Sequence, residues 1–113
     1  MRAPPEFDRL ARSFYPYSDE DYPDRSHLIA SSIYVMKFSD AQVEVLRTYL
    51  DCLLAESNEG DLEKAWTAAG AYYTYVGPNA MREFLTQVRR MLDEPPDVLD
   101  RLVKEGLKRL VGE

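Results

Sequence analysis

The stretch that decides the fold lies at residues 39–56, which read SDAQVEVLRTYLDCLLAE. Ser39 and Gln42 have the spacing of a capping box, in which two side chains satisfy free backbone amides at the start of a helix. Apolar residues then recur every three or four positions, the period at which side chains share one helical face. They are Val43, Leu46, Leu50, Leu53 and Leu54, with Tyr49 beside them. The pattern predicts a helix that begins at Ser39 and buries this face.

Two further segments precede this helix. The first carries Phe7, Leu10, Ala11 and Phe14, again at helical spacing. Pro16 should end that helix, because proline disfavours helical geometry in the residue before it. Residues 25–38 fit a helical stripe, but the β propensity of residues 33–36 also fits a short strand. We favour a helix, because the run is long and Pro23 and Asp24 suit a helix start.

Three more helices are expected on the carboxyl side. Asp61 can cap the first, which contains Leu62, Ala65, Trp66 and Ala69 and ends at Gly70. Residues 71–76 predict an extended connector whose tyrosines pack on the core. Asn79 can cap the next helix, with Met81, Phe84, Leu85, Val88, Met91 and Leu92, and Asp97 can open the last. The sequence therefore predicts an all-α fold, a single compact bundle of five or six helices that forms one domain over residues 1–113.

The net charge of the chain limits the kinds of partner that it can bind. The 113 residues include 14 basic and 20 acidic side chains, for a net charge of −6 at pH 7. Direct binding to nucleic acid or to an anionic membrane needs an excess of lysine and arginine, so we expect neither. No run approaches 18 apolar residues and no apolar leader follows Met1, so we expect a cytoplasmic location.

The acidity is unevenly distributed along the chain. Residues 1–64 hold thirteen acidic and seven basic side chains, whereas residues 65–113 hold seven of each. A surface of one sign can steer a partner of the opposite sign, although it can also serve only to keep a protein soluble.

The sequence offers little for catalysis. His27 is the only imidazole and Cys52 the only thiol, and they stand 25 positions apart. Zinc needs clustered nitrogen and sulfur ligands, and a nucleophile needs an adjacent base, so neither kind of site is indicated. We expect no enzyme activity, no metal and no cofactor.

Two surfaces are candidates for binding a protein. The loop between the first two helices interleaves tyrosines, which are enriched at interface hot spots, with carboxylates that can pair with lysine or arginine. Its candidate residues are Tyr15, Tyr17, Asp19, Glu20, Asp21, Tyr22 and Asp24. The second candidate comprises Glu56 and Glu59 near Gly60, together with Asp61 and Glu63, although acids there also favour a helix start.

Two segments carry a family resemblance. Residues 62–73, LEKAWTAAGAYY, and residues 81–90, MREFLTQVRR, resemble the C-terminal half of immunity proteins from bacterial contact-dependent growth inhibition systems. Phe14 and Tyr15, followed by the acids at 19–21, are similar to the aromatic-then-acidic opening of that family. The family's His and Trp in this opening are absent here, and the similarity spans roughly residues 7–92.

The resemblance implies a function. Immunity proteins of this family bind and neutralise the toxin carried by a neighbouring cell's surface protein, and many such toxins are basic nucleases. We therefore expect a one-to-one complex in which an acidic, tyrosine-rich surface occludes a basic toxin domain. The alternative is a helical adaptor or regulatory subunit that presents Leu99, Leu102, Leu107 and Leu110 to another protein. A small enzyme using His27 and Cys52 is a third possibility.

Overall fold

Six α-helices make up the part of the chain described by the computed structural model, which covers residues 3–14, 25–71 and 74–110. In chain order they are α1 (Pro5–Arg12), α2 (Arg25–Met36), α3 (Asp40–Glu56), α4 (Glu59–Ala68), α5 (Ala80–Met91) and α6 (Pro96–Leu110). The predicted all-α fold class is confirmed, and residues 25–36 form a helix rather than a strand. Ala71 and residues 74–76 lie outside any helix, and Tyr72 and Tyr73 lie outside the described residues.

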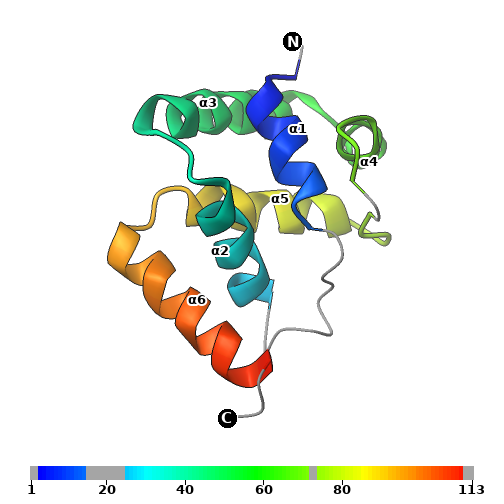
Figure 1. Ribbon diagram of the computed structural model, residues 1–113. Helices are drawn as coiled ribbons and strands as arrows, with labels where there is room; N and C mark the ends of the chain where they lie inside the picture. Colours follow the sequence, from blue (N-terminus) through cyan, green and yellow to red (C-terminus); the bar gives the residue numbers. More distant parts are fainter. Residues whose placement is uncertain (1–2, 15–24, 72–73, 111–113) are drawn as a thin grey trace.

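The central helix of the bundle is α5. It contacts α2, α3 and α4, while α1 contacts α2 and α3. Figure 1 shows α3 along the top of the molecule, α5 across its middle, and α4 closing one end. The outermost helix, α6, packs along α2 through the most extensive contact between any two helices in the described residues.

Aromatic rings join four of the helices in the core. The Trp66 ring of α4 is fully buried and lies edge-on to three phenylalanine rings. Its centroid is 5.7 Å from that of Phe7, 5.6 Å from that of Phe14 and 5.2 Å from that of Phe84. Phe7 in turn lies 4.9 Å from Tyr49 of α3. Such edge-to-face pairs add to the stabilisation that burial already provides.

Two predicted helix ends are confirmed, and in both the residues that form the end are close neighbours in the sequence. The Ser39 hydroxyl accepts from the Gln42 amide at 3.2 Å, and the Ser39 amide donates to the Gln42 side chain at 2.9 Å, so the capping box is confirmed. Gly70 follows α4 with φ of 101°, a backbone conformation that glycine adopts without strain.

The expected cap of α4 and the expected start of α6 are both wrong. Asn58, not Asp61, caps α4, and its side chain accepts from the Asp61 amide at 2.8 Å. Asn58 comes first along the chain and reaches this amide, so the helix begins before Asp61. The last helix begins at Pro96 rather than Asp97, because proline's fixed φ suits the first helical position.

The apolar stripe of α6 packs against the core. Leu99, Leu102 and Val103 are partly buried against it, while the side chains of Leu107 and Leu110 lie outside the described residues. The described part of this stripe therefore serves the bundle. Over residues 3–14, 25–71 and 74–110, every helix is too short or too polar to cross a membrane.

Replacing Ser39 with alanine should lower the free energy of unfolding by about 1 kcal/mol, because the first turn of α3 loses its cap. Urea unfolding followed by circular dichroism measures this loss. Thr48→Ala, an exposed position within the same helix, is the matched control and should leave stability unchanged or slightly raised. Equal stability of Ser39→Ala and the wild type would contradict the capping role.

Candidate functional site

Most of the predicted binding residues fall between α1 and α2 along the chain. Tyr15, Tyr17, Asp19, Glu20, Asp21, Tyr22 and Asp24 lie outside the described residues. Their predicted contact with a toxin therefore stays a prediction. The remaining two, Glu56 and Glu59, lie together where α3 ends and α4 begins.

Glu59 caps a helix that is distant in sequence. Its Oε2 accepts from the Met81 amide at 2.6 Å, and its Oε1 accepts from the Arg82 amide at 3.2 Å. These amides open α5, where a carboxylate also interacts favourably with the helix dipole. Asn79 occupies the N-cap position with φ of 59° but makes no side-chain capping bond, so the expectation that it caps α5 is wrong. The cap comes from α4 instead.

Arg82 makes the reverse connection, from α5 to the end of α3. Its guanidinium donates to the carbonyl oxygen of Leu54 at 2.6 Å and also to that of Ser57. A cation at the C-terminus of a helix satisfies free carbonyls and complements the dipole. Glu59 and Arg82 together therefore fix the corner between α3 and α4 against α5.

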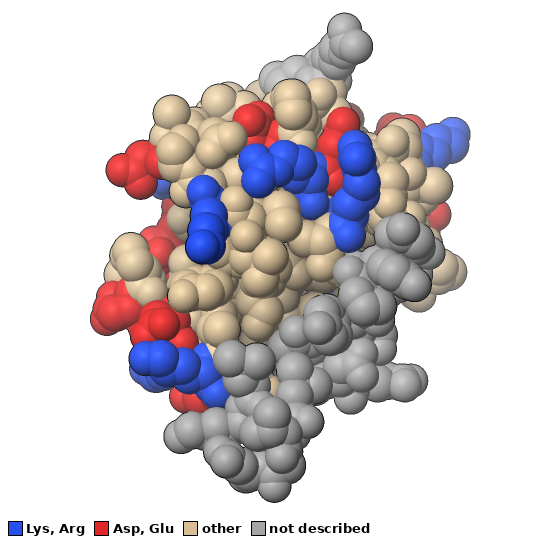
Figure 2. Space-filling model, viewed as in Figure 1, with Lys and Arg blue, Asp and Glu red and all other residues tan. Residues whose placement is uncertain are grey.

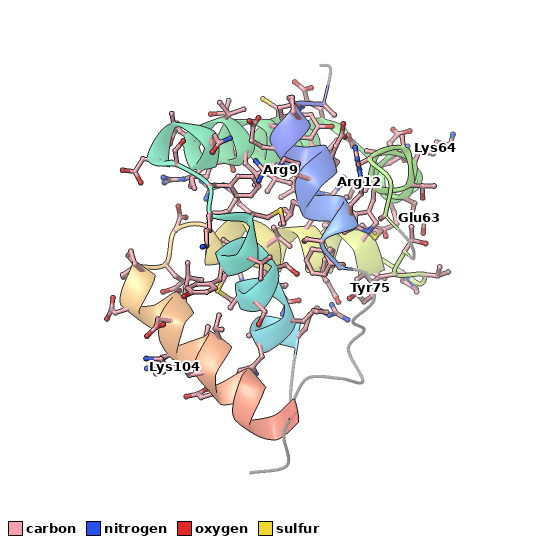
Figure 3. All side chains as sticks on the ribbon, in the orientation of Figure 1. Arg9, Arg12, Glu63, Lys64, Tyr75 and Lys104 are labelled. Atoms are coloured by element: carbon pink, nitrogen blue, oxygen red, sulfur yellow. The ribbon has the colours of Figure 1, made fainter. Side chains whose placement is uncertain are left out.

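This corner displays carboxylates that have no ion-pair partner among the described residues. Glu56 and Asp61 are exposed and Glu63 is half-buried. Within the residues that the structure describes, none of the three carboxylates forms an ion pair, and we call this set the acidic corner. Figure 3 shows Glu63 and its basic neighbour Lys64 on α4, at the edge of the molecule. The corner is thus available to groups outside the protein.

Other acidic side chains form ion pairs within the fold. Arg89 of α5 bridges Asp51 at 2.7 Å and Asp93 at 2.9 Å, and Arg47 of α3 bridges Asp93 at 2.7 Å and Glu44 at 3.4 Å. The hydrogen bond from Arg89 lowers the pKa of Asp51, and the same bond raises the pKa of Arg89. This network connects α3 to the end of α5 and neutralises three of the carboxylates.

The two catalytic candidates lie on different helices. His27 of α2 is 8% exposed, and its Nε2 lies 3.0 Å from Glu105 Oε2 of α6, so the imidazole joins two helices. Cys52 is half-buried on α3. In the described ranges no group of three or more His, Cys, Asp or Glu side chains is arranged to hold a metal ion.

A polar pocket of about 550 Å³ lies between the start of α2 and α5. It is lined by Arg25, Asn79, Arg82, Glu83, Thr86, Gln87 and Arg90. The Arg25 guanidinium lies 4.4 Å from the Tyr75 ring centroid and donates to the Gln87 side chain at 3.3 Å. Tyr75 in turn lies 4.5 Å from Phe84, which confirms for this residue that the connector's tyrosines pack on the core.

Comparison with protein-family models, with curated proteins and with solved structures found no match to this chain. The chemistry of the site therefore rests on its own residues. Exposed carboxylates on a corner braced by Glu59 and Arg82 are suited to forming ion pairs with a basic surface.

Removing the Glu59 carboxylate should destabilise the fold. Glu59→Ala leaves two amides of α5 without their charged acceptor, and we expect a loss of about 2 kcal/mol in the free energy of unfolding. Chemical denaturation measures it. Glu63→Ala, on the same helix but without such a bond, is the matched control. Equal stability of the two variants would rule out the capping role.

The bond from Arg89 to Asp51 makes stability depend on pH. Because the folded-state pKa of Asp51 is lowered, its contribution is fully present above the unfolded-state value of about 3.9 and is lost as pH falls through the folded-state value. At pH 7, Asp51→Asn should cost roughly 0.5 kcal/mol, because the pair is exposed. This difference should shrink between pH 4 and pH 2, measured by urea unfolding. In an Arg89→Gln background Asp51→Asn should have no such effect, and an undiminished cost there would contradict the assignment.

Proposed function

We propose that this protein binds a basic toxin domain and neutralises it by covering it, as its resemblance to contact-dependent growth inhibition immunity proteins implies. The observation that supports the proposal most directly is the acidic corner. Arg47 and Arg89 neutralise Glu44, Asp51 and Asp93 within the fold, whereas Glu56, Asp61 and Glu63 remain available. Unpaired carboxylates on a rigid corner fit a partner rich in lysine and arginine.

A nuclease is such a partner. Enzymes that grip phosphates carry clustered cations, so an acidic protein can cover the active site and compete with nucleic acid. The corner is already ordered by Glu59 and Arg82, and preorganised groups lose little conformational entropy on binding. Residues 15–24 would add four carboxylates and three tyrosines to the same kind of contact.

The alternative, a helical adaptor that presents α6, has less support. Leu99 and Leu102, two of the four residues it would use, pack against the protein's own core. The proposal for a toxin-binding protein uses carboxylates that the fold does not require.

Growth protection tests the proposal. The first step is to establish whether the reading frame immediately upstream ends in the variable tail of a large secreted protein, and that tail is then the partner to use. Cells that express this tail alone should stop growing, and co-expression of the present protein should restore growth. The purified proteins should form a one-to-one complex. No protection and no complex would overturn the proposal.

Removing the charges of the acidic corner tests whether this surface contacts the toxin. The triple change Glu56→Gln, Asp61→Asn and Glu63→Gln should slow association with the tail about tenfold at low ionic strength, measured by stopped flow. The difference in association rate between the variant and the wild type should become small at about 0.5 M salt, because dissolved ions screen electrostatic attraction over distance.

A matched control removes three exposed carboxylates elsewhere. Asp40→Asn, Glu94→Gln and Asp97→Asn change the net charge equally, at the starts of α3 and α6 and in the turn between α5 and α6. This control should slow association much less than the corner variant. Equal effects of the two variants would show that only the total charge matters.

A further inference from the structure

A hollow of about 280 Å³ lies where the end of α2, the start of α3, the end of α5 and the start of α6 come together. Its lining includes five apolar side chains that belong to the core or pack against it, namely Ile33, Phe38, Val43, Leu92 and Leu99. Ile33 and Leu92 are buried, whereas the other three are only partly buried. Small-molecule sites are typically apolar clefts with a few polar groups. The fold therefore leaves an apolar surface here that a small ligand can cover.

Charged side chains of both signs line the same hollow. They are Lys37, Asp40 and Glu94, and all three are exposed. Among the described residues, none of the three forms an ion pair with another of the three or with any other side chain. Opposite charges that share a hollow without pairing can both be satisfied by one ligand that carries an ammonium group and a carboxylate.

The backbone is ordered at each of the three charged residues. The Lys37 amide donates to the Tyr34 carbonyl at 3.3 Å, and the Glu94 amide donates to the Met91 carbonyl at 3.1 Å. Asp40 is the first residue of α3 and directly follows its capping residue. The charged side chains therefore project from fixed ends of helices, and preorganised groups lose less conformational entropy on binding.

The size and the charge of the hollow limit the kind of ligand. Its volume suits a molecule about the size of one large amino acid rather than a helix of a partner protein. Figure 2 shows blue and red side chains interspersed around tan surface on the side where α3 and α6 begin. A surface of mixed sign favours neither a polyanion nor a polycation, whereas a small molecule with one charge of each sign matches it.

We propose that this hollow, which we call the amino-acid pocket, binds a free α-amino acid with a large apolar side chain. The side chain of the ligand lies against the apolar lining. Its ammonium group pairs with Asp40 and Glu94, and its carboxylate pairs with Lys37. Burial of the side chain supplies most of the affinity, and the three charges select the zwitterion. The proposal does not rest on the toxin-binding function, because the pocket shares no residue with the acidic corner.

Titration with L-phenylalanine tests the pocket. Amide shifts of the full-length, nitrogen-15-labelled protein are followed by NMR as the amino acid is added. Saturable shifts should be confined to residues 33–43 and 92–99, with a dissociation constant of about 1 mM, as expected for a small ligand in a shallow site. No shifts, or shifts that do not saturate by about 20 mM, would overturn the proposal.

Three related compounds test which groups of the ligand are recognised. 2-Phenylethylamine lacks the carboxylate and 3-phenylpropionate lacks the ammonium group, so each should bind about fivefold more weakly than phenylalanine. Glycine has both charges but no side chain and should cause no saturable shift. Equal binding of phenylalanine and the two singly charged compounds, or equal binding of glycine, would overturn the assignment of a zwitterion with an apolar side chain.

Charge variants test the contacts on the protein. Lys37→Gln should weaken phenylalanine binding about fivefold without weakening 2-phenylethylamine, which has no carboxylate to pair with this lysine. Glu94→Gln should weaken phenylalanine and the amine together without weakening 3-phenylpropionate. The matched controls are Lys64→Gln and Asp61→Asn, two exposed positions of α4, and both should leave binding unchanged. Equal effects of the pocket variants and their controls would overturn the proposal.

Discussion

Burial of the Trp66 ring is the interaction on which the rest of the structure depends. The helix that carries this ring and the helix that brings Phe7 against it are both short, because α4 has 10 residues and α1 has 8. Isolated helices of such length are marginal in water, so their stability comes from packing. Phe7, Phe14 and Phe84 bring α1 and α5 against Trp66. The aromatic cluster therefore holds α4, which carries part of the acidic corner, against α1 and α5.

Charged side chains divide into those that serve the fold and those that do not. Glu59 and Arg82 satisfy the ends of two helices, and Arg89 joins α5 to Asp51 of α3. The three carboxylates of the acidic corner form no ion pair in the described residues. These carboxylates can therefore pair with the cations of a partner.

Local sequence patterns predicted much of the fold. Helical periodicity placed the helices and their buried residues, and the capping box at Ser39 and the turn at Gly70 depend only on neighbours within a few positions. The caps from Glu59 and Arg82 join residues 22 to 28 positions apart. No local pattern reveals such pairs, because they form only after the helices have packed.

The candidate site was less predictable for the same reason. Glu56 and Glu59 look equivalent in sequence, yet one is exposed and the other caps α5.

Hydrogen exchange of the complex tests the central claim most directly, that carboxylates left unpaired by the fold form the contact with a basic toxin. Amide exchange is measured by mass spectrometry for the free protein and for the protein bound to the upstream-encoded tail. The account predicts slower exchange at residues 15–24 and 56–63 in the complex, with residues 34–37 unchanged. Slower exchange confined to residues 34–37 or to α6, with residues 56–63 unchanged, would contradict it.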